Sequence, residues 1–389
     1  MNRFLQISCL LLLNSAQIAF AAPPASTQPL FVTKFRWGPS EDIIELETTW
    51  NGKPVNFCFD SGATDCLLDS AIFQNLRPTN QETDVGTSGG QKTFQLFDTP
   101  ELNIGPLRLK DAGSVVCTDL SALNALLDRP IAGVLGNNLW RKLVVQIDFD
   151  AGQLRFLTPD DLPHPEWGSV VPLESAQGPD GPDNAMAYVR LNVAGSEGLF
   201  IVDTGDNGTA SLTSAGFDYI LENTKLAVLL RPEETAGGTF DARKFRIPTF
   251  TFADQHYKDL IFTETKGWAG ALGVRFLSRH LVTIDFPHAR LFLKPGKDIN
   301  RPDPCDMSGI ALRRSAKQTT AIIIPSTPAN QAGMHTGDAL IEVNGKPADS
   351  YTLHELQALF WSKAGQQINI KFLRDGKTQS ATFKLRKLL

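Results

Sequence analysis

Hydrophobic and polar residues alternate along two stretches of the chain that lie far apart in the sequence. Residues 44–62 read IELETTWNGKPVNFCFDSG, and residues 188–205 read YVRLNVAGSEGLFIVDTG. Each stretch begins with alternating apolar and polar residues and passes through a polar turn that contains glycine. It then continues as an apolar run that ends in Asp-Ser/Thr-Gly. Alternation on both sides of a glycine-containing turn is typical of a β-hairpin. Each stretch therefore predicts two paired strands with an aspartate at the end of the second.

These hairpins are part of a longer repeat. Residues 132–137 (AGVLGN) correspond to residues 269–274 (AGALGV), and an Ile-Asp-Phe tripeptide follows each of them, at residues 147–149 and 284–286. The landmarks come in the same order and at nearly constant spacing in both halves. Such a repeat predicts two lobes built on the same plan.

Short runs rich in Val, Ile, Phe and Thr predict mostly strands in both lobes, which we place at residues 29–158 and 184–297. The clearest helical stretches are residues 120–127 and 214–223. Residues 159–183, rich in Pro, Gly and Asp, are the expected connection between the lobes.

The pattern changes near residue 306, and we predict a third domain at residues 306–389. Residues 337–345 read GDALIEVNG, which indicates a strand that ends in a tight turn. Residues 351–360 have the spacing of an amphipathic helix, and residues 368–385 that of a closing hairpin. A linker with two prolines, residues 300–306, precedes this domain.

Composition narrows the possible functions. A chain of 389 residues with 42% hydrophobic and 20% charged residues is long enough for two to three globular domains. Its formal charge is −5 and no stretch is dense in Lys or Arg, so nucleic acid is not an expected partner. The six histidines are scattered and there is no Cys-x-x-Cys, so we expect neither a metal site nor a cofactor.

The first 21 residues have the features of a secretory signal. Arg3 gives a positive start, residues 7–13 form an apolar run, and residues 19–21 (Ala-Phe-Ala) match a cleavage site. The run is shorter than the roughly 20 residues that a membrane span needs. We therefore expect cleavage of residues 1–21 and export to the periplasm or the medium. An oxidising compartment permits disulfides in three alternative pairings among four remaining cysteines: Cys58, Cys66, Cys117 and Cys305.

The two Asp-Ser/Thr-Gly motifs, each followed by an apolar-Leu-Gly, resemble those of the pepsin and retropepsin class of aspartic proteases. The resemblance covers residues 43–294. It implies an endopeptidase that acts on polypeptides, with Asp60 and Asp203 as catalytic residues. Two carboxylates held together share a proton, so one activates a water molecule while the other protonates the carbonyl oxygen.

The neighbours of the aspartates have expected supporting roles. Gly62 and Gly205 let the backbone turn tightly beside the carboxylates. The resemblance implies that the hydroxyl groups of Ser61 and Thr204 brace the two loops against each other. Ala63 stands where pepsin-like enzymes often have a hydroxyl group, which predicts raised pKa values and a less acidic pH optimum than that of pepsin.

Asp206 occupies the matching position in the second motif. It either raises the pKa values of the pair further, or points to solvent and caps the next turn; we favour the second arrangement. Residues 207–209 (Asn-Gly-Thr) also match a glycosylation sequon, which we interpret as part of a turn.

A glycine-rich turn follows each aspartate after about thirty residues, with Gly89 and Gly90 in the first lobe and Gly237 and Gly238 in the second. A hairpin tip at each place would act as a flap that covers the cleft and binds the substrate backbone. Two flaps favour a fused retropepsin pair over a pepsin-like enzyme with one. The alternative is an ordinary exposed turn.

The third domain resembles a PDZ domain, which implies binding of peptide C-termini by strand addition. The loop that would hold the peptide carboxylate contains Gly309, Ile310, Ala311 and Leu312, with Ala311 in place of a family glycine. The alternative is a domain that packs on the protease and binds no free peptide.

The sequence thus predicts a mostly β fold, with two duplicated aspartic-protease lobes related by a pseudo-twofold axis and followed by a PDZ-like α+β domain. The alternative function is a catalytically silent pair of lobes that serves as a peptide-binding adaptor with a PDZ module. Intact motifs argue against the adaptor, and Asp206 argues slightly for it. A serine protease is disfavoured, because the sequence has no Gly-x-Ser-x-Gly and no recognisable triad histidine.

Overall fold

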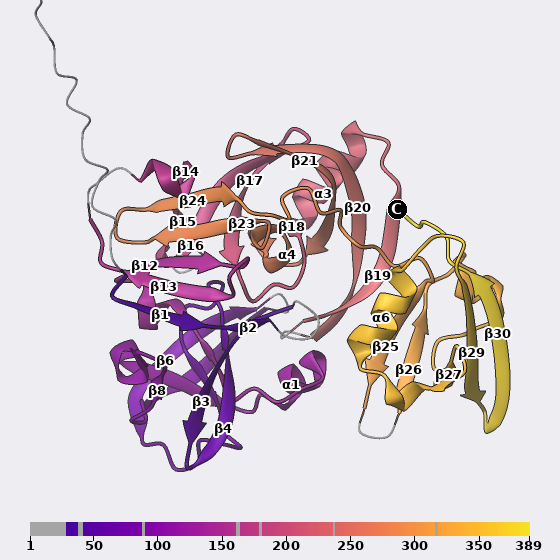
Figure 1. Cartoon of the computed structure of the whole chain (residues 1–389), viewed down its shortest axis with the longest axis horizontal. Helices are drawn as coiled ribbons and strands as arrows, with labels where there is room; N and C mark the ends of the chain where they lie inside the picture. Colours follow the sequence, from indigo (N-terminus) through magenta and orange to yellow (C-terminus); the bar gives the residue numbers. More distant parts are fainter. Residues whose placement is uncertain are drawn as a thin grey trace, which may run out of the picture.

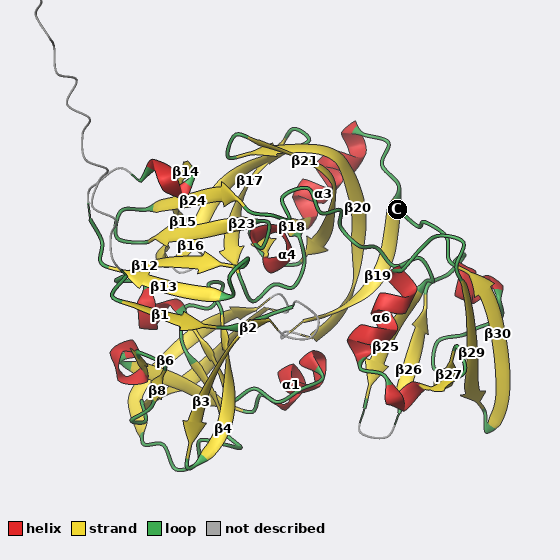
Figure 2. Ribbon diagram, in the orientation of Figure 1, coloured by secondary structure: helices red, strands yellow, loops and turns green. Residues whose placement is uncertain are grey.

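Strands form most of the structure, which consists of two lobes and a smaller C-terminal domain (Figure 2). The computed structural model describes residues 29–37, 42–87, 90–160, 164–178, 181–235, 238–315 and 318–389. The predicted signal segment, residues 1–21, lies outside the described residues. Within those ranges, no helix has the length and apolar character needed to cross a membrane.

The N-terminal lobe is centred on an eight-stranded sheet. Its strands, in the order in which they lie side by side, are β2 (Arg36–Trp37), β3 (Ile44–Trp50), β4 (Lys53–Phe59), β11 (Gly133–Leu135), β5 (Leu67–Asp69), β10 (Ser114–Thr118), β7 (Gly90–Asp98) and β6 (Pro78–Thr87). The remaining elements of the lobe are β8 (Asn103–Ile104), β9 (Leu107–Arg108), the 3-10 helix η1 (Leu109–Ala112), α1 (Ser121–Leu127) and α2 (Asn137–Trp140). The predicted hairpin corresponds to β3 and β4, and α1 lies within the predicted helix.

The C-terminal lobe contains a second eight-stranded sheet. Its strands lie in the order β15 (Glu174–Gly178), β16 (Gly181–Val193), β17 (Ser196–Asp203), β22 (Gly270–Gly273), β18 (Ala210–Thr213), β21 (Gln255–Thr265), β20 (Gly238–Phe252) and β19 (Val228–Thr235). Two helices accompany it, α3 (Ser214–Asn223), which matches the predicted residues, and α4 (Val274–Leu277).

The two sheets have the same topology. β4 runs parallel to β11 as β17 does to β22, and β5 runs parallel to β10 as β18 does to β21. The other neighbouring pairs are antiparallel in both sheets. This correspondence is what the sequence repeat predicts, while descent of the lobes from one duplicated unit stays a prediction.

A third sheet joins the lobes. Its six strands lie in the order β1 (Phe31–Lys34), β13 (Gln153–Leu157), β12 (Val144–Asp148), β23 (His280–Asp285), β24 (Arg290–Pro295) and β14 (Ser169–Pro172). At its middle β12 of one lobe pairs with β23 of the other, and Gln146 Nε2 donates a hydrogen bond of 3.0 Å to Thr283 Oγ1. One apolar core runs through both lobes, so the lobes are fixed relative to each other.

The connection between the lobes is more regular than its composition suggests. Within residues 159–183 the structure has the 3-10 helix η2 (Pro165–Trp167), followed by β14, β15 and the start of β16. β14 and β15 each form the edge of a sheet. Edge strands tolerate proline and glycine, because one side of the strand needs no ladder partner.

The C-terminal domain has its own sheet and its own core. The strands lie in the order β25 (Ile310–Arg314), β26 (Thr319–Ile323), β27 (Ala339–Val343), β29 (Gln367–Arg374) and β30 (Lys377–Lys384), with β28 (Lys346–Pro347) beside β27. The helical segments are α5 (Pro328–Gln331), the 3-10 helix η3 (Ala348–Ser350) and α6 (Leu353–Trp361). Thr352 and Glu355 form a capping box that starts α6, and its apolar face buries Leu356 and Phe360.

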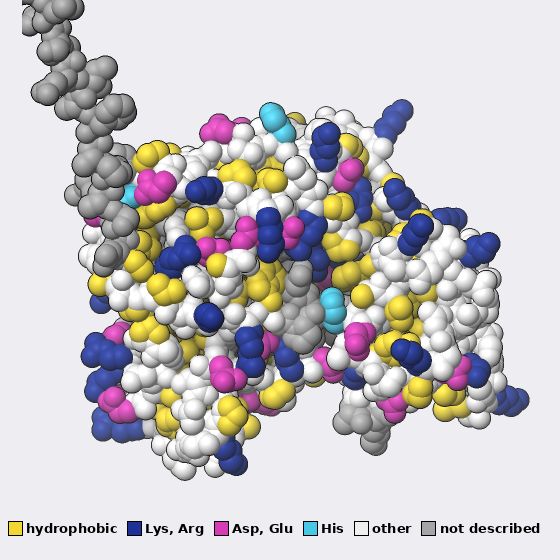
Figure 3. Space-filling view, in the orientation of Figure 1, with side chains coloured by type: hydrophobic (Ala, Val, Ile, Leu, Met, Phe, Trp, Pro, Cys, Tyr) yellow, Lys and Arg dark blue, Asp and Glu magenta, His cyan; other side chains and the backbone are white. Residues whose placement is uncertain are grey.

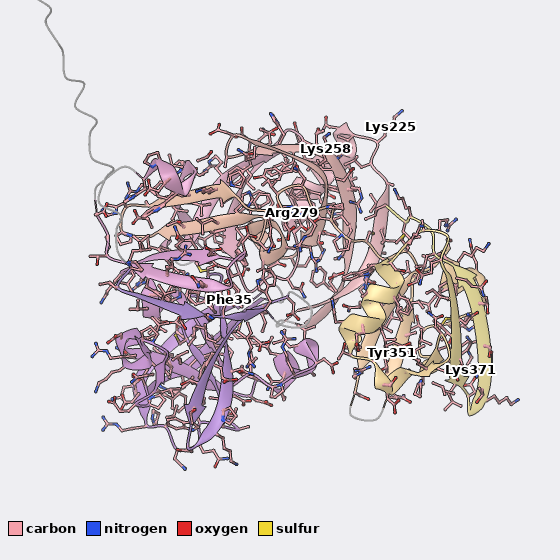
Figure 4. The ribbon with its side chains drawn as sticks, viewed as in Figure 1. Phe35, Lys225, Lys258, Arg279, Tyr351 and Lys371 are labelled. Atoms are coloured by element: carbon pink, nitrogen blue, oxygen red, sulfur yellow. The ribbon has the colours of Figure 1, made fainter. Side chains whose placement is uncertain are left out.

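The segment predicted as a linker is pinned to the C-terminal lobe. The carboxylate of Asp303 accepts hydrogen bonds from Ile261 N (2.6 Å) and from Arg279 Nη2 (2.7 Å). The side chains of Asp303 and Arg279 are each only 1% exposed, and Arg279 lies inside the lobe (Figure 4). This buried ion pair holds the chain in place directly before the last domain.

The N-terminal lobe also contacts the last domain. Asp128, directly after α1, accepts hydrogen bonds from Arg314 Nη1 (3.1 Å) at the end of β25 and from Leu353 N (3.2 Å) at the start of α6. α1 and α6 accordingly face each other across the gap between lobe and domain (Figure 1). Contacts from both lobes thus set the position of the C-terminal domain.

Candidate active site

Asp60 and Asp203 lie at equivalent ends of two strands. Asp60 directly follows β4, and its backbone N–H donates to Leu135 O (3.1 Å) on the neighbouring β11. Asp203 is the last residue of β17 and lies opposite Gly273 of β22. Each aspartate is thereby fixed by a parallel strand pair, and both side chains are half-buried.

The two carboxyl groups meet between the lobes. A Cβ atom added to Gly62 would lie 2.3 Å from Asp203 Cγ, and one added to Gly205 would lie 2.4 Å from Asp60 Oδ2. Each glycine also donates its N–H to the aspartate of its own motif, over 2.7 Å in the first lobe and 2.8 Å in the second. Glycine is therefore required at both places, because any side chain would displace the opposite carboxyl group.

Ser61 and Thr204 interlock beneath the carboxyl groups. Ser61 Oγ donates to Val202 O (2.6 Å) and accepts from Thr204 N (3.0 Å). In the reciprocal pair, Thr204 Oγ1 donates to Phe59 O (2.9 Å) and accepts from Ser61 N (2.9 Å). Both side chains are fully buried. The two loops brace each other in the way that the family resemblance implies.

The glycine of each apolar-Leu-Gly motif packs under the loop of its lobe. A Cβ on Gly136 would lie 2.4 Å from Asp65 O, and a Cβ on Gly273 would lie 2.3 Å from Gly208 O. These contacts leave no room for a side chain, so the motif glycines allow the later strand to pass directly beneath the aspartate loops.

Asn137 is a supporting residue that the sequence reasoning missed. Its Nδ2 donates to Ser61 O (3.0 Å), and the side chain is fully buried. The sequence contained a sign of this role. Asn137 ends the AGVLGN segment, whereas the apolar Val274 ends the equivalent AGALGV, so the two repeats differ at this position. The first loop thus has a polar side-chain support at a position where the second lobe has an apolar residue.

Burial is the main cause that raises the pKa values of both aspartates. Burial raises the pKa of Asp60, while hydrogen bonds with Gly62 and Asp203 oppose the rise. The pKa of Asp203 lies well above its usual range because of burial and because of the nearby charges of Asp60 and Asp206. The pair therefore holds a proton at a higher pH than an isolated aspartate would.

Asp206 takes an intermediate position between the two expectations. Its Oδ1 accepts from Gly208 N (2.6 Å), so it caps the next turn as expected. The side chain is half-buried, however, rather than directed fully into solvent. Burial raises the pKa of Asp206, and its charge in turn raises those of Asp60 and Asp203.

Basic side chains near Asp206 come from distant parts of the chain. The positive charges of Lys244 on β20 and Arg275 on α4 lower the pKa of Asp206, against the larger effect of burial. Lys244 also forms an ion pair of 2.8 Å with Glu233. No local sequence pattern links these residues to the motif, which is why sequence reasoning did not find them.

The four cysteines in the described part of the chain, Cys58, Cys66, Cys117 and Cys305, are all free. Cys58, two residues before Asp60, is buried among apolar side chains that include Ile43, Leu127 and Val134. Cys66 Sγ instead accepts a hydrogen bond from a backbone N–H, and burial raises the pKa of its thiol to about 12. The first aspartate loop is thus held by packing and hydrogen bonds, without a cross-link between its two flanking cysteines.

The segments predicted as flaps are the ends of hairpins. β6 and β7 pair in register up to Thr87 and Gly90, and β19 and β20 up to Thr235 and Gly238. Gly89 and Gly237, at the predicted tips, lie outside the described residues. The hairpins are as predicted, and their role as flaps stays a prediction.

A cavity of about 300 Å³ lies at the junction of both lobes and the C-terminal domain, and neither Asp60 nor Asp203 is among its lining residues. It extends from the turn after Asp206 to α6, and its lining includes Asn207, Arg231, Lys244, Arg275, His354 and Trp361. Basic and acidic side chains are interspersed over the visible face of the molecule (Figure 3). Among the described residues, no group of three or more His, Cys, Asp or Glu side chains is placed to hold a metal ion.

The loop predicted to bind a peptide carboxylate precedes and begins β25, which pairs only with β26 among the described strands and so leaves one edge open. Gly309 has a φ of 80°, and Ile310 and Ala311 are buried. Leu312 is half-buried. The loop therefore has the position that strand addition by a peptide would need.

Comparison with known families agrees with this architecture. The family model for aspartyl proteases matches residues 46–139, which run from β3 to α2 and contain Asp60. The family model for PDZ domains matches residues 270–385, which begin at β22 and include the separate C-terminal core. No curated protein matches the chain. The chain therefore contains a retropepsin-like aspartyl-protease domain and a PDZ domain.

Proposed function

We propose that the chain is an aspartic endopeptidase in which Asp60 and Asp203, one from each lobe, activate a water molecule against a peptide bond. The observation that carries this proposal is the reciprocal approach of Gly62 to Asp203 and of Gly205 to Asp60. Such an approach supports a shared proton between the two carboxyl groups, since two like charges so close are unfavourable.

The pKa of Asp203 is raised well above its usual range, which supports the acid role that we give to Asp203 and the base role that we give to Asp60. Ionised Asp60 takes a proton from water, and the water oxygen forms a bond to the carbonyl carbon of the substrate. Asp203 gives its proton to the carbonyl oxygen, which yields a neutral tetrahedral diol. Asp203 then takes back one proton from a hydroxyl group of the diol, and Asp60 gives its proton to the leaving nitrogen. The C–N bond breaks, and both aspartates return to their starting protonation states.

We further propose that the protein is exported, to the periplasm or the medium, after removal of residues 1–21. The basis is the basic start, short apolar run and Ala-Phe-Ala site of the N-terminal sequence. Mass spectrometry of the protein from a secreting host checks this: a mature chain that begins at Ala22 supports export, and an intact Met1 contradicts it.

The decisive experiment for activity is the digestion of an unfolded protein such as reduced casein between pH 3 and pH 8. Residues 22–389 are compared with the same chain carrying Asp60→Asn. Cleavage by the unaltered chain alone supports the proposal. Equal cleavage by both chains, or none by either at any pH, contradicts it. The second outcome favours the silent peptide-binding adaptor, for which the additional carboxylate of Asp206 beside the pair is the supporting observation.

A further inference from the structure

The PDZ carboxylate loop lies beside the C-terminal end of α6. Met307 N donates to Phe360 O (3.0 Å), which ties the residue before the loop to the last turn of the helix. β25 starts at Ile310 and leads away from the loop with one edge open. A peptide added to this edge would therefore place its C-terminus at the backbone amides of residues 308–310.

A carboxylate already occupies two of these three amides, and it belongs to the chain itself. Asp306 Oδ1 accepts from Ser308 N (3.0 Å) and from Ser308 Oγ (2.7 Å), and Asp306 Oδ2 accepts from Gly309 N (2.9 Å). The third amide, Ile310 N, donates to Ser308 Oγ (3.0 Å). Successive backbone N–H groups thus hold an internal carboxylate by the kind of contact that a peptide C-terminus would make.

The surroundings of Asp306 make this occupancy stable. Its side chain is fully buried, and Arg231 Nη1 on β19 lies 3.8 Å from Oδ2. A buried carboxylate with hydrogen bonds and a nearby cation is compensated, whereas a second carboxylate brought to the same loop would find its donors used and a like charge in place.

We propose that Asp306 is an internal ligand that closes the carboxylate site of the PDZ domain. A free peptide C-terminus gains nothing from its carboxylate in this state, and it binds through that group only after Asp306 has left the loop. The contact with Arg231 also joins the closed loop to β19 of the protease lobe, so the closed state and the docked position of the domain support each other.

The test measures peptide binding and needs no catalysis, so its outcome is independent of the proposed endopeptidase activity. Fluorescein-labelled decapeptides that end in Ala, Val, Leu or Phe are made both as free acids and as C-terminal amides. Fluorescence anisotropy gives their Kd values for residues 22–389 with Asp60→Asn, which prevents digestion. The same chain with Asp306→Asn is measured next, and Asp349→Asn, at an exposed acid of the same domain, is the control.

In the parent chain, which carries Asp60→Asn alone, and in the Asp349→Asn control, the free-acid and amide forms of each peptide should bind with Kd values within threefold of each other. Asp306→Asn should make the acids bind at least tenfold more tightly than the amides. A tenfold preference for acids in the parent chain would overturn the proposal, and this comparison stands even where Asp306→Asn disturbs folding. No preference, or no binding at all, in a folded Asp306→Asn chain would overturn it equally.

Discussion

Gly205 lies directly against the carboxyl group of Asp60, so closely that a Cβ atom at this position would come within 2.4 Å of Asp60 Oδ2. Gly205 is thus part of the C-terminal lobe, but it contacts the catalytic candidate of the N-terminal lobe. Gly62 stands in the same relation to Asp203.

Gly205→Ala should abolish hydrolysis, because the added methyl group forces the two carboxyl groups apart and removes the shared proton. We expect a loss of at least a hundredfold in kcat/KM, since small misplacements at a reacting centre cost about that much. Gly198→Ala is the matched control, because a Cβ there would meet nothing closer than 3.6 Å. Equal activity of the two variants in a peptidase assay would contradict the proposed arrangement.

Thr204→Val should destabilise the protein and weaken activity. Valine keeps the shape of threonine but leaves Phe59 O without its donor and Ser61 N without its acceptor. Each orphaned buried group costs about 1–3 kcal/mol. Urea unfolding should show this loss, whereas Thr204→Ser, which retains the hydroxyl group, should remain close to the unaltered protein. A valine variant as stable as the serine variant would speak against the bracing role.

Asp206→Asn should shift the pH profile of kcat/KM toward lower pH. The charge of Asp206 raises the pKa values of both catalytic candidates, so its removal lowers them. Because the active form carries one proton on the pair, both limbs of the profile should move to lower pH. Asparagine can still cap Gly208 N, and Asp241→Asn, at an exposed acid of the same lobe, should leave the profile in place. An unchanged pH profile in the Asp206→Asn variant would show that the charge of Asp206 does not affect the pKa values of Asp60 and Asp203.

Asp303→Ala should loosen the PDZ domain and destabilise the C-terminal lobe. The change leaves the buried charge of Arg279 without its partner, which costs about 3–5 kcal/mol. Limited trypsin digestion should cut after Lys297 faster than in the unaltered chain, and thermal unfolding should begin earlier. Asp298→Ala removes only a half-exposed partner of Arg301 and is the control. Equal digestion rates would show that the linker is held by other contacts.

Local patterns in the sequence predicted much of the fold. The repeated hairpins, α1, α3, α6 and the closing hairpin of the PDZ domain all follow from periodicity and turn residues over short stretches. The two aspartates were identified because each motif lies in a repeat, and repetition turns a weak tripeptide into a strong signal. The connecting strands β14 and β15 were missed, because sheet edges accept a composition that elsewhere indicates a loop.

The remaining features depend on contacts between distant parts of the chain. The pKa of Asp206 is set by burial and by Lys244 and Arg275, and the contact of Asp128 with Arg314 joins two domains. Asp306 is different, because the spacing Asp-Met-Ser-Gly is local and an aspartate commonly accepts from the backbone two residues on. The sequence places it at the end of the predicted linker, and its position directly before the loop is visible there.

The central claim is that Asp60 and Asp203 act as one unit. Its most direct test is kcat/KM for Asp60→Asn, Asp203→Asn and the double variant, measured on one fluorogenic peptide selected from the casein digest. Residues that share one catalytic step are strongly non-additive. We predict that each single change lowers kcat/KM by at least a thousandfold and that the double variant is no worse than either. Near-normal activity of one single variant, or losses that multiply in the double variant, would contradict the account.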